Sequence, residues 1–140
     1  MKVKVIFQGR RRLHGDEQFI ARDGAKALAL TRDVVLFCGN VPVVYAHSVL
    51  QPSDRGAGWR LMQGMGSRPL GAALFTDPRI ERSMLRQRKL GCSHPLYRQA
   101  LVASGMVSLG VPLWARRSLF MAGKSPILVT EVFLPGVLTI

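Results

Sequence analysis

The sequence predicts a single α+β domain built mainly from antiparallel β-hairpins. The chain has 140 residues, the size of one domain, and 48% of them are hydrophobic, which is enough for a buried core. Short segments rich in β-branched and aromatic residues alternate with turns that contain Gly, Pro or Asn. No internal repeat, low-complexity tract or linker interrupts this pattern, so we expect one folded unit over residues 1–140.

The first half of the chain is predicted to contain three strands. Lysines alternate with apolar residues over residues 2–7, as in a half-buried strand. We interpret residues 8–15 as a basic turn and 16–24 as an irregular segment or a short helix. A Gly-Asn turn then joins the strands expected over 27–37 and 43–50 into a hairpin.

The second half is predicted to mix helices with two further strands. Ser93-His94-Pro95 is typical of a helix start and Gly105 of a helix end, which predicts a helix over 96–104. Residues 79–90 carry five basic side chains and fit either a helix or an edge strand. The remaining expected segments are a loop over 51–58, a short helix over 59–65, a turn over 67–75, and strands over 111–121 and 126–135.

Two charged residues stand within otherwise apolar strands. Glu131 lies in the middle of the predicted last strand, where an ionised carboxylate is costly unless it is paired or solvated. Strand alternation places Arg32 on the apolar face that also carries Leu30 and Val34, so Arg32 needs an anionic partner or ligand. Three interpretations remain open from the residues alone: a solvent-facing Glu131, a structural Arg32–Glu131 ion pair, or a closed pocket that uses both residues.

The charge balance favours anionic ligands. Lys and Arg total 20 against 8 Asp and Glu, a formal net charge of +12, which attracts nucleic acid, acidic surfaces or small anions. Nucleic-acid binding ranks last, because the basic residues are not interleaved with the few aromatic ones. The N-terminus lacks the apolar core of a signal peptide and the longest apolar span is broken by polar residues, so we expect a cytoplasmic protein without membrane insertion. Cys38 and Cys92 fit reduced thiols, with a disulfide as the alternative.

The common cofactor and metal motifs are absent from the sequence. The three histidines are scattered, without a cysteine or carboxylate at metal-ligand spacing. A nucleophile elbow, a dinucleotide fingerprint and a phosphate loop are also missing. If the protein is an enzyme, we expect it to need neither metal nor organic cofactor.

Five sequence segments resemble the chorismate pyruvate-lyase family, in the family's order and across nearly the whole chain. They are Arg32-Asp33-Val34-Val35-Leu36, the hairpin arm over 41–50, Arg68-Pro69-Leu70-Gly71 with Leu74-Phe75-Thr76, Leu113-Trp114-Ala115-Arg116-Arg117-Ser118, and Val129-Thr130-Glu131-Val132-Phe133-Leu134-Pro135. The resemblance implies an antiparallel sheet of about six strands, with helices packed over it and an internal cavity. It also implies cofactor-free elimination of pyruvate from chorismate to give 4-hydroxybenzoate for ubiquinone synthesis, by a cytoplasmic enzyme that we expect to be a monomer.

The resemblance also assigns site residues. The family's product-binding arginine falls on Arg32, its glutamate on Glu131, and a leucine that contributes its backbone on Leu70. Arg116 and Arg117 are candidates for the second carboxylate of chorismate, and alternation allows at most one of them to serve.

The chain departs from the family in two places. His47 stands where many members have an arginine, which makes the positive charge there weaker or pH-dependent. Met1 lies almost at the first predicted strand, so we expect the family's N-terminal helical segment, with its product-contacting methionine, to be missing. The alternative function is a non-catalytic domain that binds aromatic acids, because the effector domains of some transcription regulators share the family's fold.

Overall fold

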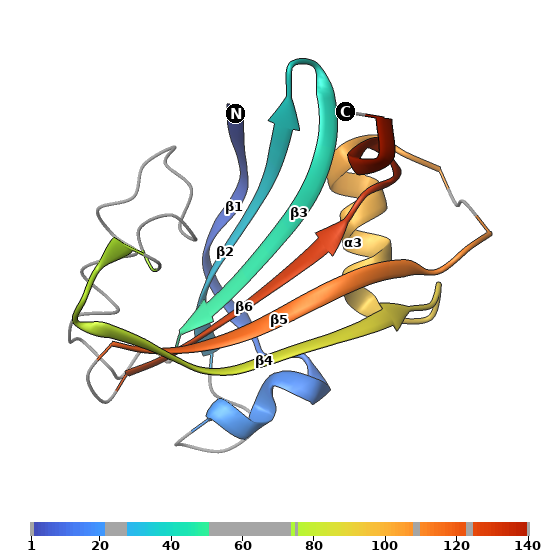
Figure 1. The fold of residues 1–140 in the computed structure, drawn as a ribbon. Helices are drawn as coiled ribbons and strands as arrows, with labels where there is room; N and C mark the ends of the chain where they lie inside the picture. The colour runs from blue at the N-terminus through green and yellow to red at the C-terminus, as the bar shows by residue number, and fades with distance from the viewer. Residues whose placement is uncertain are drawn as a thin grey trace.

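A six-stranded antiparallel sheet organises the whole structure (Figure 1). The computed structural model describes residues 2–21, 28–50, 74, 76–107, 110–122 and 125–139. The strands are β1 (Lys2–Arg12), β2 (Leu28–Cys38), β3 (Val41–Leu50), β4 (Ile80–Leu90), β5 (Leu113–Ala122) and β6 (Ser125–Phe133). They are joined in the order β1-β2-β3-β6-β5-β4, so the predicted α+β class and the strand number implied by the resemblance are confirmed.

The β2–β3 hairpin forms where the sequence predicts it. Gly39 occupies the turn with φ +62°, a backbone conformation that glycine adopts without steric cost. The segment over residues 79–90, which fits either a helix or an edge strand, contains the edge strand β4 from Ile80 onwards. Its arginines and lysine give the exposed sheet edge a charged surface, and such a surface disfavours pairing with another chain.

One prediction about the N-terminal region is wrong. Residues 8–12 do not form a basic turn but continue strand β1 as far as Arg12. An irregularity in the β1–β2 pairing between Val5 and Phe7 changes the register, after which Gln8 pairs with Arg32 and Arg11 with Ala29. The run of arginines therefore lies on an edge strand, where long charged side chains remain solvated.

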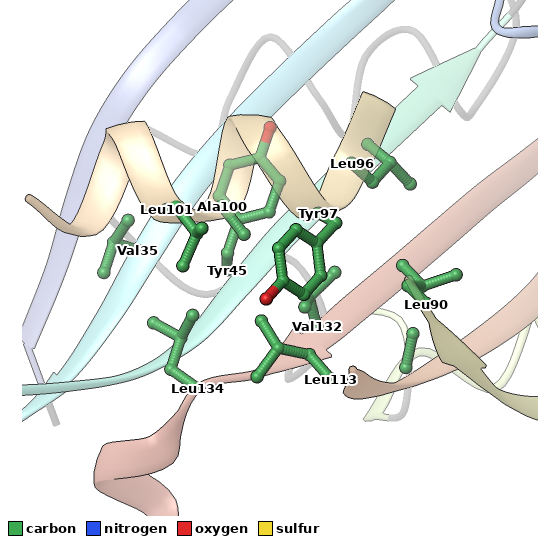
Figure 2. Packing of buried hydrophobic residues seen from close by; sticks show 11 residues of the cluster. Val35, Tyr45, Leu90, Leu96, Tyr97, Ala100, Leu101, Leu113, Val132 and Leu134 are labelled. Carbon is green, nitrogen blue, oxygen red and sulfur yellow. The ribbon is translucent and has the colours of Figure 1, made fainter. Parts of the chain in front are cut away.

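The main core lies between the sheet and helix α3 (Pro95–Ser104) (Figures 1 and 2). Figure 2 shows Tyr97, Ala100 and Leu101 of α3 pointing at Val35 and Val132 of the sheet. The helix begins after His94, whose Nδ1 accepts a hydrogen bond from the Leu96 backbone N–H. It ends at Gly105 in the left-handed region, which confirms the predicted start and end signals.

The short 3-10 helix η1 (Gly15–Ile20) covers the same face of the sheet as α3. Its Ile20 packs with Ala29, Val49 and Leu128, which alternate with the residues of the opposite face. That opposite face carries a second cluster, of Leu30, Leu50, Leu74, Phe120, Ile127 and Val129. A second 3-10 helix, η2 (Pro135–Thr139), follows β6. The central strands are therefore buried on both faces.

Three further findings bear on the sequence predictions. Cys38 and Cys92 are both free and exposed. In the part of the chain that the structure describes, no helix combines the length and apolar character needed to cross a bilayer. The predicted loop over 51–58, the helix over 59–65 and nearly all of the turn over 67–75 lie outside the described residues.

Candidate functional site

Arg32 is a buried cation in the middle of β2. Arg32 is 1% exposed, and its Nη1 donates a hydrogen bond of 2.8 Å to Oε1 of Gln8 on the neighbouring strand β1. Burial lowers the pKa of Arg32, but an arginine begins so far above neutral pH that it stays charged. A charged guanidinium inside the protein can bind an anion through its planar set of N–H donors.

Glu131, in the middle of β6, is paired with an arginine other than Arg32. Both Nε and Nη2 of Arg116, on the adjacent strand β5, donate to Glu131 Oε1, at 3.0 and 2.8 Å. The side chains of Arg116 and Glu131 are 32% and 23% exposed, so the pair is partly open to solvent. Within the described residues, the Arg32–Glu131 ion pair that the sequence left open is therefore replaced by Arg116–Glu131.

The strand register places Arg32 and Glu131 on one face of the sheet. Arg32 of β2 lies opposite Ser48 of β3, which in turn lies opposite Val129 of β6. Two residues along β3 from Ser48, Ala46 lies opposite Glu131 of β6. Strand spacing and rise then put the Cα atoms of Arg32 and Glu131 roughly 12 Å apart. The intervening strand β3 presents only the short side chains of Ala46 and Ser48 between them. Two long charged side chains thus flank a row of small ones.

One end of this face is apolar. Leu30 and Val129 lie on the strands that carry Arg32 and Glu131, Leu50 lies on β3 between them, and all three belong to one cluster with Leu74. This apolar cluster adjoins the buried guanidinium, an arrangement that suits a ligand with a hydrophobic body and an anionic end. Leu70, the third residue assigned from the resemblance, lies outside the described residues.

Arg116 and Arg117 point to opposite faces, as alternation predicts. Arg117 lies on the α3 side, where its Nε donates to Thr130 Oγ1 at 2.9 Å and its Nη2 is 3.5 Å from Asp16 Oδ1. Of the two arginines, only Arg116 shares a face with Arg32 and Glu131.

A buried charge cluster on the α3 side was missed in the sequence. His47 lies between two carboxylates, with Nδ1 2.5 Å from Asp33 Oδ1 and Nε2 2.9 Å from Glu17 Oε2. All three residues are 3% exposed or less. The Nε2 and Oε2 atoms lie at ion-pair distance, although they do not form a hydrogen bond. Two carboxylates facing the two ring nitrogens favour the protonated, cationic form of His47.

The pKa values in this cluster have physical causes that agree with a charged His47. Burial lowers the pKa of His47, but the hydrogen bonds and charges of Asp33 and Glu17 outweigh burial and raise the pKa to about 9. Burial likewise raises the pKa of Glu17, yet the contact with His47 holds it below its ordinary value. Burial and the Asp33 charge raise the pKa of Tyr45, so its hydroxyl stays protonated and donates to Asp33 Oδ2 at 2.9 Å.

The same cluster bears on the expectation that the protein has no metal site. Candidate ligand atoms of His14, Glu17 and His47 lie within 4.8 Å of one another, and His47 comes from a part of the chain far from the other two. Both His47 nitrogens already face carboxylates, Nδ1 that of Asp33 and Nε2 that of Glu17. Burial lowers the pKa of the adjacent His14, which leaves His47 as the cation of the cluster.

A family model and curated relatives match the chain. The model described as chorismate lyase matches residues 1–139. A probable chorismate pyruvate-lyase of Nitrosospira multiformis is 44% identical over 136 residues, which span 97% of this chain and 74% of the relative. A protein with the same description from an Azoarcus species is 44% identical over 138 residues, 97% of this chain and 73% of that one.

Solved structures support the fold. The PhnF C-terminal domain matches with a TM-score of 0.69 at 12% identity, covering 94% of this chain and 80% of that one. The C-terminal domain of the histidine utilization repressor from Pseudomonas syringae has a TM-score of 0.65 at 12% identity, covering 96% and 91%. These likenesses concern the fold alone, whereas the family model and the close relatives establish ancestry. This chain belongs to the chorismate lyase family.

Proposed function

We propose that this protein is a chorismate pyruvate-lyase, which splits chorismate into 4-hydroxybenzoate and pyruvate. Membership of the chorismate lyase family and relatives described as probable chorismate pyruvate-lyases support this function. The structural observation that carries it is the placement of buried Arg32 and of Glu131 on one face of the sheet, with small side chains between them. An aromatic acid with a para hydroxyl has polar groups at its two ends, which matches this arrangement.

Arg32 binds the ring carboxylate in this proposal. The planar guanidinium offers two parallel N–H donors to a carboxylate, a geometry that lysine cannot reproduce. Two unit charges 4 Å apart interact by about 4 kcal/mol at an effective dielectric near 20, before the cost of desolvation. Gln8 fixes Nη1 of Arg32, so the guanidinium is oriented before the ligand arrives.

Glu131 binds the ring hydroxyl at the other end, and Arg116 is its positioning partner. Of the two candidate arginines, we assign Arg116 to the carboxylate of the pyruvyl group, because it lies on the site face and touches Glu131. In the reaction, the ring carbon that bears the hydroxyl loses its proton, and the ether bond on the neighbouring carbon breaks. The electrons of the broken C–H bond complete the aromatic ring, and the released enolpyruvate takes up a proton to become pyruvate.

The elimination transfers no electrons to an external acceptor, so the proposed reaction requires no cofactor. The formation of an aromatic ring makes the elimination favourable. In well-aligned intramolecular systems, correct orientation lowers the activation barrier by up to roughly 7–11 kcal/mol. We further propose that the product is held in an internal cavity on the Arg32 face, with a contact from the Leu70 backbone. The 4-hydroxybenzoate would serve ubiquinone synthesis in the cytoplasm, with the enzyme acting as a monomer.

A direct assay tests the proposal. The purified chain, incubated with chorismate, is expected to release pyruvate and 4-hydroxybenzoate in equal amounts. Pyruvate is followed with lactate dehydrogenase and NADH, and the aromatic product by its ultraviolet absorbance. Binding of 4-hydroxybenzoate without any pyruvate release would instead favour the alternative of a ligand-binding domain. That alternative has the support of the fold, because one structural neighbour is the ligand-binding domain of a regulator from Bordetella bronchiseptica.

A further inference from the structure

A cavity of about 280 Å³ lies on the α3 side of the sheet, away from Arg32 and Glu131. Its floor is formed by β4, β5 and β6, through residues that include Met84, Ala115 and Thr130. Its sides come from η1 and from the start of α3, through Phe19 and Leu96. The register places these floor residues on the opposite face from Glu131, because Ala115 pairs with Val132 and Arg117 with Thr130.

Three arginines line this cavity, and only one of them is neutralised. Arg117 contacts the Asp16 carboxylate at 3.5 Å, and His94 Nε2 lies 2.8 Å from the other oxygen of Asp16. Burial raises the pKa of Asp16, but the hydrogen bond to His94 and the charge of Arg117 outweigh burial and hold the pKa below its ordinary value. The one carboxylate in the lining is therefore ionised and fully engaged.

The charges of Arg86 and Arg88 are not neutralised by any carboxylate among the described residues. These arginines stand two residues apart on β4 and share the cavity-facing side of the strand. Both are exposed, and within the described part of the chain neither has a hydrogen bond or an ion pair with another residue. Two neighbouring guanidinium groups on one side of a strand repel each other, and a bound anion relieves that repulsion.

Apart from Thr130, the remaining lining is apolar. Phe19, Met84, Leu90 and Leu96 present hydrocarbon surface around the charged rim. Phe19 is 57% exposed although it is large and aromatic, so it is available to pack on a ligand. The volume is close to the lower limit for small-molecule sites, which suits a ligand of about one ring.

We propose that this cavity is a second ligand site, which takes a small aromatic carboxylate with its anionic end at Arg86 and Arg88. The ring lies against Phe19, Met84 and Leu96. The site is separated from the proposed catalytic face by the thickness of the sheet, and it requires no chemistry at Arg32 or Glu131. Its existence does not depend on whether the protein is a lyase.

Nuclear magnetic resonance of the full chain tests the proposal, with 4-hydroxybenzoate as the probe and uncharged 4-hydroxybenzamide as the comparison. We expect the methyl signals of Met84, Leu90 and Ala115 to shift on titration with the acid, and much less with the amide. A double variant, Arg86→Gln with Arg88→Gln, should weaken binding at these signals by about tenfold or more. Raising the salt concentration should weaken it as well.

A matched control variant loses the same amount of net charge. Arg10→Gln with Arg12→Gln removes two exposed arginines from β1, at the opposite edge of the sheet, and should leave the Met84 and Ala115 shifts unchanged. Equal weakening in both double variants would mean that only net charge matters, and this would overturn the proposal. So would a titration in which these methyl signals do not move. Pyruvate release from chorismate, measured on the same samples, reports separately on the proposed function.

Discussion

Arg32→Lys and Glu131→Gln are each expected to reduce pyruvate release from chorismate by about 10²–10³-fold, because each removes a preorganised charged contact to the reacting molecule. Lysine keeps the charge of Arg32 but loses the planar pair of donors. Glutamine keeps the shape of Glu131 but loses the charge that Arg116 holds in place. The measurement is steady-state turnover, with KM and kcat determined separately.

Matched controls separate the site from general charge effects. Arg10→Lys and Glu81→Gln make the same chemical changes at exposed positions of β1 and β4 and should keep wild-type turnover. Because Arg32 is buried, thermal unfolding of each variant must show that the fold is intact. Wild-type turnover in a folded Arg32→Lys and a folded Glu131→Gln variant would remove both residues from the proposed site.

The second large effect is expected at His47. Replacement by Gln removes the cation between Asp33 and Glu17 and leaves two buried carboxylates without it, so we expect a loss of about 3–5 kcal/mol in the free energy of unfolding at pH 7. Such a loss is a large fraction of the total stability of a domain this size. Urea unfolding followed by circular dichroism measures it.

The stability of the wild-type protein should also depend on alkaline pH. Because the pKa of His47 is raised from 6.5 to about 9 on folding, its contribution is fully present below pH 6.5 and is lost as the pH rises to about 9. The difference corresponds to about 3 kcal/mol. The groups facing His47 are Asp33 on β2, Glu17 on η1 and His14 before η1.

His47→Arg is the informative control for this prediction. The resemblance indicates that many family members carry arginine here, and arginine keeps its charge throughout this pH range. We expect His47→Arg to be folded and to lose the decline in stability between pH 6.5 and 9. If the wild-type and His47→Arg proteins lost stability equally over that range, His47 would not be the titrating group.

Local patterns predicted the elements whose signals are contained within a few neighbouring residues. The β2–β3 hairpin follows from its apolar strands and its Gly-Asn turn, and α3 from His94-Pro95 and Gly105. Strand alternation also placed Arg116 and Arg117 on opposite faces, as observed. These features require no knowledge of how distant segments meet.

Features that depend on register and on long-range contacts could not be predicted in this way. The sequence pattern predicts a turn at Gln8, yet Gln8 pairs with Arg32 because of an irregularity in β1 that no local pattern indicates. The partner of Glu131 is Arg116 because β5 lies beside β6, and the sequence did not show which strands are neighbours. Glu17, Asp33 and His47 come from three separate elements, so their cluster appears only in three dimensions.

The most direct test of the central claim is a crystal structure of the chain with 4-hydroxybenzoate bound. The proposed function predicts a ligand on the Arg32 face of the sheet, with its carboxylate on the Arg32 guanidinium and its hydroxyl on the Glu131 carboxylate. A ligand bound to the protein with neither Arg32 nor Glu131 within hydrogen-bond distance would contradict it.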